Sequence, residues 1–219
     1  MKKPQIGKHV DIGYFNKILK VRSKVAKKRN ILNKIEAWKL GKEYYDGARI
    51  NGYGGYKYDG LTATDASKFI VENKDNSKPW SAFINFVNPH DIMFFQTSPE
   101  IRGSGLVGDH QLTAPIGALY DLKHDFEFPK NFGPRNVIEG NFDATYIQNT
   151  IYGEIPYSQP QLWKKFCNYY FNCLRDVDRH MTTVLNALKS SNQLDNTIIF
   201  MISDHGEMLG QHGSRGKVV

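Results

Sequence analysis

A polar loop near the end of the sequence carries the side chains best suited to chemistry. It follows the apolar run 197–202 and contains Asp204, His205 and Lys217. A carboxylate beside an imidazole offers an oxygen and a nitrogen ligand to a divalent cation, although two ligands do not complete a site. A lysine is a compact positive charge that suits the oxygens of an anionic ester. The loop therefore predicts metal-assisted chemistry on a charged ester.

Each of these residues also has an ordinary structural explanation. Asp204 could cap the following turn while His205 packs against its neighbours. Lys217 could be a surface lysine. However, the loop between His205 and Lys217 contains four glycines. Glycine tolerates tight backbone turns, so the loop could fold back and bring Lys217 to a metal-bound group.

His90 is a second candidate, because it directly follows a proline at the end of the strand-like run 81–87. Its imidazole could donate a hydrogen bond to an anionic oxygen, with the neighbouring Asp91 orienting the ring. The alternative is a loop histidine whose hydrogen bonds are satisfied locally. The sequence leaves both explanations open.

Patterns before each candidate predict the elements that position it. Apolar residues recur at steps of three or four from residue 161 to 188, which predicts a long amphipathic helix. After a turn at 192–196, the continuous apolar run 197–202 is typical of a parallel strand buried on both faces. A shorter helix over 64–72, with Thr64 or Asp65 near its N-cap, precedes the aromatic and β-branched run 81–87.

This alternation of helix and strand indicates an α/β fold. Ligands in open α/β sheets bind beyond the carboxyl ends of the parallel strands. His90 lies at the end of one predicted strand, and Asp204 and His205 lie at the end of the other. The agreement of the two positions strengthens the prediction of a single site.

The remaining segments have weaker patterns. Residues 14–43 look helical and basic, and residues 47–60 read as a loop or short strand because they are rich in glycine and tyrosine. Residues 92–160 carry many Gly and Pro and little periodicity. We expect them to form a long surface excursion, the usual place for loops that determine substrate specificity.

Length and composition exclude several classes of protein. The 219 residues are enough for one sizeable domain, and 40% hydrophobic and 13% aromatic residues exclude a disordered chain. No apolar run reaches the ~18 residues of a membrane span, and the first residues lack a signal-peptide pattern. Cys167 and Cys173 fall on different faces of one predicted helix, so we expect buried thiols rather than a disulfide. The cellular compartment is not predicted.

The net charge of +7 is concentrated at the start of the sequence, where residues 1–43 hold 13 of the 29 basic side chains and 3 of the 22 acidic ones. The segment 17–29 could contact an anionic polymer, or it could be the solvated face of a helix. No zinc-finger or RNA-binding signature accompanies it, so no nucleic-acid partner is expected.

The loop sequence Ser203-Asp-His-Gly-Glu-Met-Leu-Gly-Gln-His-Gly-Ser-Arg-Gly-Lys217 resembles the sulfatase family of the alkaline-phosphatase superfamily. The resemblance is closest to the branch that contains the iduronate and choline sulfatases. It extends upstream to Thr64-Asp-Ala-Ser-Lys-Phe-Ile70 and to Lys78-Pro-Trp-Ser-Ala-Phe-Ile-Asn-Phe-Val-Asn-Pro-His90. Several spaced motifs thus occur in the family's order.

The resemblance implies a fold, which we state as an expectation. It is a partial alkaline-phosphatase-like three-layer sandwich, with a mainly parallel central sheet flanked by helices, truncated at both ends. The chain would form one partial catalytic domain, 1–219. Its parts would be an entry segment (1–57), a helix and strand ending in Pro-His (58–91), specificity loops (92–160) and a helix, strand and metal loop (161–219).

The resemblance also implies roles for individual residues. Asp204 and His205 would ligate Ca²⁺. His90 and Lys217 would bind the sulfate group and act in catalysis, with Lys217 bridging sulfate and nucleophile. The substrate would be a sulfated small molecule or a sulfated glycan.

Near the start, Gly7-Lys8-His9 resembles a family segment whose lysine and histidine contact the sulfate and the nucleophile. Lys8 would thus be catalytic and His9 would bind substrate. The family's nucleophile is a formylglycine made from Cys/Ser-x-Pro-x-Arg, and neither this motif nor the family's Asp-Asp pair occurs in the sequence. We therefore expect little or no turnover by the isolated chain.

Two alternatives to a sulfuric ester hydrolase remain at this point. One is a metallohydrolase of the same superfamily that acts on phosphate or phosphonate esters. The other is a non-catalytic fragment that binds anionic polymers through residues 17–29.

Overall fold

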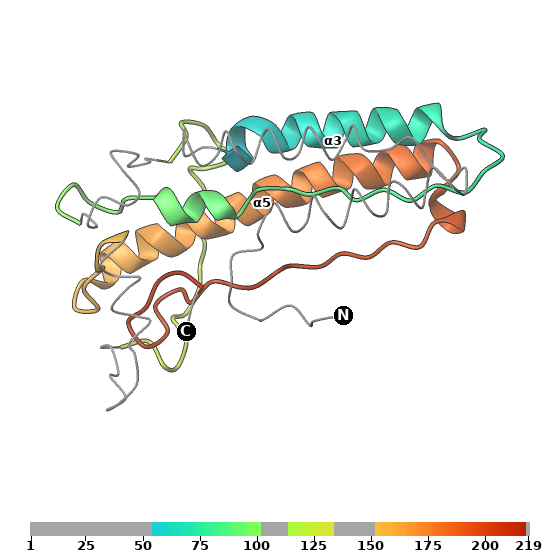
Figure 1. Cartoon of the computed structure of the whole chain (residues 1–219). Helices are drawn as coiled ribbons and strands as arrows, with labels where there is room; N and C mark the ends of the chain where they lie inside the picture. The colour runs from blue at the N-terminus through green and yellow to red at the C-terminus, as the bar shows by residue number, and fades with distance from the viewer. Residues whose placement is uncertain (1–53, 102–113, 134–151, 218–219) are drawn as a thin grey trace.

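Two long helices form the framework of the part of the chain that the computed structural model describes, residues 54–101, 114–133 and 152–217. Helices α3 (Gly54–Glu72) and α5 (Pro160–Ser190) run side by side in the same direction (Figure 1). Two short 3-10 helices, η1 (His90–Phe94) and η2 (Leu194–Asn196), follow α3 and α5 along the chain. The site residues lie on the segments that return from these long helices.

Helix α5 confirms the long helix predicted from the sequence. Pro160 stands in its first turn, where its missing N–H group costs nothing. The predicted inward stripe is buried or partly buried along its length: Leu162, Phe166, Tyr169, Cys173, Val177, Met181, Val184 and Leu188. Cys167 and Cys173 are buried free thiols, as predicted. Burial raises the pKa of Cys167 to about 12 and that of Cys173 well above its usual value.

Helix α3 ends where the sequence predicted but begins ten residues earlier, at Gly54. The prediction of a loop or short strand over 47–60 is therefore wrong for residues 54–60. Thr64 is not an N-cap, since it lies inside the helix and its hydroxyl donates to the carbonyl of Gly60 at 2.8 Å. The glycines at the helix start allow a close approach that overrides their low helix propensity: a Cβ on Gly55 would stand 2.2 Å from Cγ of Asn88.

Two apolar clusters hold the helices and loops together. The first joins Ala63, Ala66 and Ile70 of α3 to Val184, Ala187 and Leu188 of α5. The second lies around the N-terminal half of α5, where Tyr169 stacks on Phe95 with ring centroids 4.1 Å apart. Its buried members also include Ile92, Tyr120, Ile155 and Trp163. The described parts of 92–160 therefore contribute core residues as well as surface loops.

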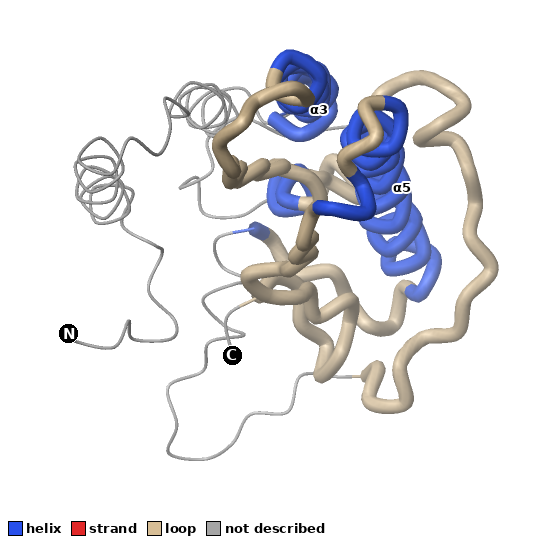
Figure 2. Tube along the Cα trace, turned by 90° about the vertical axis from the view of Figure 1, so that its right-hand side faces the viewer, coloured by secondary structure: helices blue, strands red, loops and turns tan. Residues whose placement is uncertain are grey.

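The two predicted strands are extended segments without a strand ladder. Among the described residues the bridge between Phe132 and Gln211 is isolated, and Figure 2 shows helices and loops there. Ile198 and Phe200 are 83% and 84% exposed, so the prediction that 197–202 is buried on both faces is wrong for this structure. A strand needs hydrogen-bonding neighbours and covered faces, and the described residues supply neither to this segment.

The two extended segments nevertheless run in the direction expected for parallel strands. Segments 81–87 and 197–202 both return from the far end of the helix pair and run the same way along it (Figure 1). Their carboxyl ends, with His90 and Asp204, therefore point to the same end of the molecule. None of the helices in the described ranges is long and apolar enough to cross a membrane.

Candidate functional site

The structure brings together two of the predicted site residues from distant parts of the sequence. Nζ of Lys217 lies 3.1 Å from Nδ1 of His90. Both side chains are half-buried. An ammonium can only donate hydrogen bonds, so Nδ1 accepts from Lys217 and the ring proton stays on Nε2. The contact thus places the Lys217 ammonium and the His90 imidazole side by side.

The glycine-rich loop folds back on itself, as predicted, and so carries Lys217 to His90. The N–H of Met208 donates to the carbonyl of Gly216 at 2.9 Å, and that of Gly210 donates to Ser214 at 2.9 Å. Gly210 has φ +90°, which favours glycine, and a Cβ there would lie 2.7 Å from the Phe132 ring.

Arg215 fastens this loop to the segment that carries His90. Its side chain is buried, and its guanidinium donates to the carbonyls of Tyr152 at 3.2 Å and Phe95 at 3.3 Å. The same group lies over the Phe166 ring, 5.0 Å from its centroid. Burial lowers the pKa of Arg215 to about 10, so the group remains charged at neutral pH. It is a structural cation rather than one that faces substrate.

Burial and nearby carboxylates shift the pKa of Lys217 in opposite directions. Burial lowers the pKa of Lys217, and the charges of Asp204 and Glu207 partly offset that shift. Glu207 is itself enclosed by the loop and accepts the N–H of Gly216. Burial raises the pKa of Glu207 to about 7, against the opposing effect of Arg215 and Lys217. Lys217 is thus influenced by two carboxylates of its own loop, the exposed Asp204 and the partly buried Glu207.

Asp204 and His205 contact each other, and the charge of Asp204 acts on Lys217. Nε2 of His205 lies 3.2 Å from Oδ2 of Asp204. The His205 side chain is 40% exposed and the Asp204 side chain 81%. Their donor types fit a divalent cation, as predicted. However, the described residues bring no third histidine, cysteine or acidic side chain into a group that could hold a metal ion. They form a partial donor set rather than a complete calcium site.

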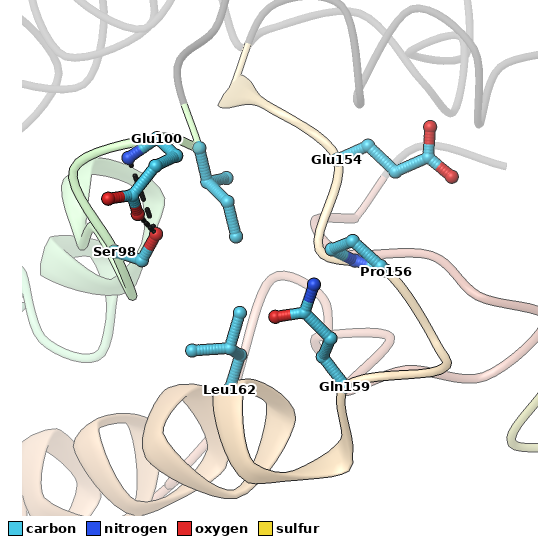
Figure 3. Close-up of a pocket in the computed structure, with 7 residues that line it drawn as sticks. Ser98, Glu100, Glu154, Pro156, Gln159 and Leu162 are labelled. Carbon is cyan, nitrogen blue, oxygen red and sulfur yellow. Dashed lines mark hydrogen bonds between the residues drawn. The ribbon is translucent and has the colours of Figure 1, made fainter.

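A pocket of about 480 Å³ opens between the segment after η1 and the start of α5 (Figure 3). Its lining residues are Ser98, Glu100, Ile101, Glu154, Pro156, Gln159 and Leu162, and none of the four described site residues is among them. The carboxylates of Glu100 and Glu154 come from opposite sides, and Ser98 hydrogen-bonds to Glu100. Two negative charges would repel a sulfate ester, so this pocket is not the anion site.

Sequence reasoning missed the buried polar residues that hold the site in place. Arg215 lies inside the motif that carried the family resemblance, but its sequence neighbours do not reveal its burial. Asp59 lies in a Gly- and Tyr-rich stretch that reads as a loop, although burial raises its pKa to about 7. Asp91 does not act as expected: both of its oxygens accept backbone N–H groups of α3. Lys8 and His9, and the basic segment 17–29, lie outside the described residues.

The described residues thus bring an ammonium and an imidazole into contact, and the exposed Asp204–His205 pair lies on the same loop as Lys217. The family model for Sulfatase matches residues 11–218, and the chain belongs to the sulfatase family of sulfuric ester hydrolases.

Curated relatives agree with this assignment. A protein named Sulfatase from Formosa agariphila is 46% identical over 55 residues, which cover 25% of this chain and 11% of the relative. A protein named Arylsulfatase from Clostridium perfringens is 25% identical over 144 residues, 65% of this chain and 25% of the relative. The matched parts thus span a quarter or less of these relatives. No solved structure matches the chain.

Family membership confirms the predicted sulfatase resemblance and supports sulfated compounds as the class of substrate. It also implies the alkaline-phosphatase-like α/β fold. The described residues contain the helices and the parallel course of two extended segments, but not the strand pairing of a sheet.

Proposed function

We propose that this chain supplies the sulfate-binding and part of the metal-binding site of a sulfuric ester hydrolase that acts on a sulfated small molecule or glycan. The single observation that carries the proposal is the 3.1 Å contact between Nζ of Lys217 and Nδ1 of His90. Two residues of the proposed site, 127 positions apart, meet in this contact.

Hydrogen-bond donors are the chemistry that these residues contribute. The Lys217 ammonium and the Nε2–H group of His90 can each donate to a sulfate oxygen. Negative charge shifts among the sulfate oxygens and the leaving oxygen when the S–O bond breaks. Fixed donors in a partly dry site stabilise that charge without having to reorganise, which lowers the barrier. Partial burial of Lys217 favours this effect because it lowers the local dielectric.

Asp204 and His205 would contribute two ligands of a divalent cation, which we propose to be Ca²⁺. A bound cation supplies Lewis-acid polarisation of an anionic oxygen. The remaining ligands would come from outside the described residues. The exposure of both side chains leaves them accessible to such partners.

The finer parts of the fold and site belong to the same proposal. We propose a three-layer sandwich in which 81–87 and 197–202 are parallel strands of one central sheet, with 92–160 determining substrate choice. Lys8 would assist catalysis, and His9 would contact the substrate. Because the chain has no Cys/Ser-x-Pro-x-Arg nucleophile, we propose that the isolated 219 residues turn over little or no sulfate ester.

Two substrates with the same leaving group test the function. The longest open reading frame that contains the chain would be expressed and assayed with nitrophenyl sulfate and nitrophenyl phosphate. We expect preferential turnover of the sulfate ester, and a loss of at least ~100-fold in kcat/KM for Lys217→Ala. Preference for the phosphate ester would favour the phosphohydrolase alternative. Sulfate turnover that is unchanged in Lys217→Ala would contradict the proposed site.

A further inference from the structure

Two buried carboxylates, Asp59 on α3 and Asp91 on η1, each bind the backbone of the other's segment. The oxygens of Asp59 accept the N–H groups of Val87 at 2.7 Å and Asn88 at 2.9 Å. The oxygens of Asp91 accept those of Gly55 at 3.1 Å and Tyr56 at 3.0 Å. We call this reciprocal arrangement of Asp59 and Asp91 the carboxylate clamp.

The clamp carries a cost in free energy, because both of its carboxylates are buried. Asp59 is 1% exposed and Asp91 is fully buried. Burial of a carboxylate is unfavourable, and two of them near each other repel. Charge-assisted bonds to four backbone N–H groups offset this cost, and Asp91 also gains from the positive end of the α3 dipole. What the clamp provides in return is a fixed position for two pairs of peptide groups, Val87–Asn88 and Gly55–Tyr56.

His90 lies between Asn88 and Asp91, where the clamp holds the chain. Asp59 holds the chain just before it, at Val87 and Asn88, and Asp91 holds it just after. The N–H of His90 itself donates to the carbonyl of Val87 at 2.9 Å, which closes a tight turn. The imidazole is therefore placed by α3 rather than by its own loop. On the other side, Arg215 ties the Lys217 loop to the carbonyl of Phe95.

We propose that Asp59 and Asp91 are positioning residues, acting through the backbone of residues 87–91 to hold the His90 ring in contact with Lys217. That this pair binds sulfate rests on the proposed function; the positioning itself does not. Both oxygens of each carboxylate accept backbone N–H groups, which is the basis of this role.

An experiment without sulfate tests the positioning. In the full 219-residue chain labelled with ¹⁵N histidine, Lys217→Ala should move the Nδ1 signal of His90, because it removes the 3.1 Å donor. The same substitution made on top of Asp59→Asn or Asp91→Asn should move that signal several-fold less, since the contact is already loosened. Asn keeps the shape of Asp but leaves one of the two backbone donors without an acceptor.

Asp176→Asn is the matched control. Asp176 is as buried as Asp59, but its direct partners are Tyr120 at 3.0 Å, Arg179 at 2.8 Å and His180 at 3.3 Å. It reaches the His90 turn indirectly, through the Tyr120 hydroxyl that accepts from the Asn88 side chain, and it bonds none of the backbone N–H groups that the clamp holds. In that background Lys217→Ala should move the Nδ1 signal as much as in the unmodified chain. An equally large movement in the Asp59→Asn and Asp91→Asn backgrounds would overturn the inference. So would an equal reduction in the Asp176→Asn background, since the effect would then reflect general loosening.

Hydrogen exchange of the unmodified chain gives a second test that does not depend on the variants folding. The amides of Gly55, Tyr56, Val87 and Asn88 should be protected like those in the middle of α3. Exchange at the rates of an unprotected loop would overturn the inference. Failure of the proposed function is a separate result, because it appears as absent sulfate binding or turnover while these signals remain as expected.

Discussion

The ammonium nitrogen of Lys217 lies 3.1 Å from Nδ1 of His90, although 127 residues separate the two in sequence. Neither residue could reach this position by local structure alone. His90 is held through α3 by the carboxylate clamp, and Lys217 is held through the buried guanidinium of Arg215. Because α3 and α5 pack along their length, the pair depends on the whole helix framework.

Substitution of either member of this pair should weaken the binding of inorganic sulfate to the full chain. Each donor forms a charge-assisted hydrogen bond worth about 1.5–3 kcal/mol, which corresponds to a loss of roughly 10- to 100-fold in affinity. The double variant His90→Ala with Lys217→Ala should lose less than the product of the two single effects, because the residues act as a unit. Isothermal titration calorimetry measures all four affinities.

The matched control is Lys189→Ala, which removes an exposed lysine in the last turn of α5. Its sulfate affinity should stay within about two-fold of the unmodified chain, in line with the small energies of exposed charges. Equal losses in Lys189→Ala and Lys217→Ala would mean that sulfate responds to net charge alone, against the proposed site.

Calcium binding should depend on Asp204 and His205. In the longest open reading frame that contains the chain, Asp204→Asn and His205→Ala should each weaken Ca²⁺ binding by roughly 10- to 100-fold, since each removes one proposed ligand. Asp195→Asn, an exposed carboxylate on η2, is the control and should leave the affinity unchanged. Calcium titration followed by an indicator dye measures the affinities of the unmodified protein and the three variants. Unaltered binding in both site variants would remove Asp204 and His205 from the metal site.

Periodicity predicted the helices well because it reports the burial that holds them. The stripe from Leu162 to Leu188 is the face that α5 buries. The start of α3 was missed because glycines that read as loop are accommodated by Asp91, whose oxygens lie 35 residues or more away in sequence. No local pattern contains that partner.

The apolar run 197–202 shows what composition does not predict, which is the burial of a segment. Its composition correctly predicts an extended segment, and its direction agrees with a parallel strand (Figure 1). Whether such a run is buried depends on neighbouring strands, and Ile202 is 92% exposed among the described residues. The candidate site residues were proposed from the chemistry of their side chains, whereas Arg215 and Asp59 act through burial, which only the folded chain reveals.

Stability should depend on pH through Asp59. Burial raises its pKa from 3.8 to about 7, with the charges of Asp91 and Asp176 adding to the shift. The folded chain therefore binds the proton more tightly than the unfolded chain. This contribution is fully present below pH 3.8 and is lost as the pH rises towards 7.

Asp59→Asn removes this titration and so isolates it. The free energy of unfolding of the unmodified chain, minus that of Asp59→Asn, should fall between pH 4 and 7 by up to ~4 kcal/mol and then level off. Urea unfolding followed by circular dichroism at several pH values gives the difference. A difference that grows with pH would show that the carboxylate is stabilised in its charged form instead.

Gly210 should tolerate no side chain, whereas Gly206 should. Alanine at 210 combines a φ of +90° with a Cβ 2.7 Å from the Phe132 ring, and such strain costs ~1–3 kcal/mol. At Gly206 nothing among the described residues lies within 4 Å of an added Cβ. Thermal unfolding should place Gly210→Ala about 2–10 °C below the unmodified chain and Gly206→Ala within about 1 °C of it. Similar melting temperatures for the two variants would contradict the folded-back loop.

Arg215 should be required for both stability and sulfate affinity, although it does not face the anion. Arg215→Met leaves the carbonyls of Tyr152 and Phe95 without this donor and removes one of the two positive charges near Glu207, at a cost of ~3–5 kcal/mol. Arg215→Lys keeps the charge but cannot reach both carbonyls, so its loss should be intermediate. Urea unfolding and sulfate titration would be measured on the same preparations. The titration would be done without urea, at a temperature at which each variant is folded. If Arg215→Met binds sulfate as tightly as the unmodified chain, Lys217 is held at His90 by the backbone of the loop alone, and the role given to the guanidinium is wrong.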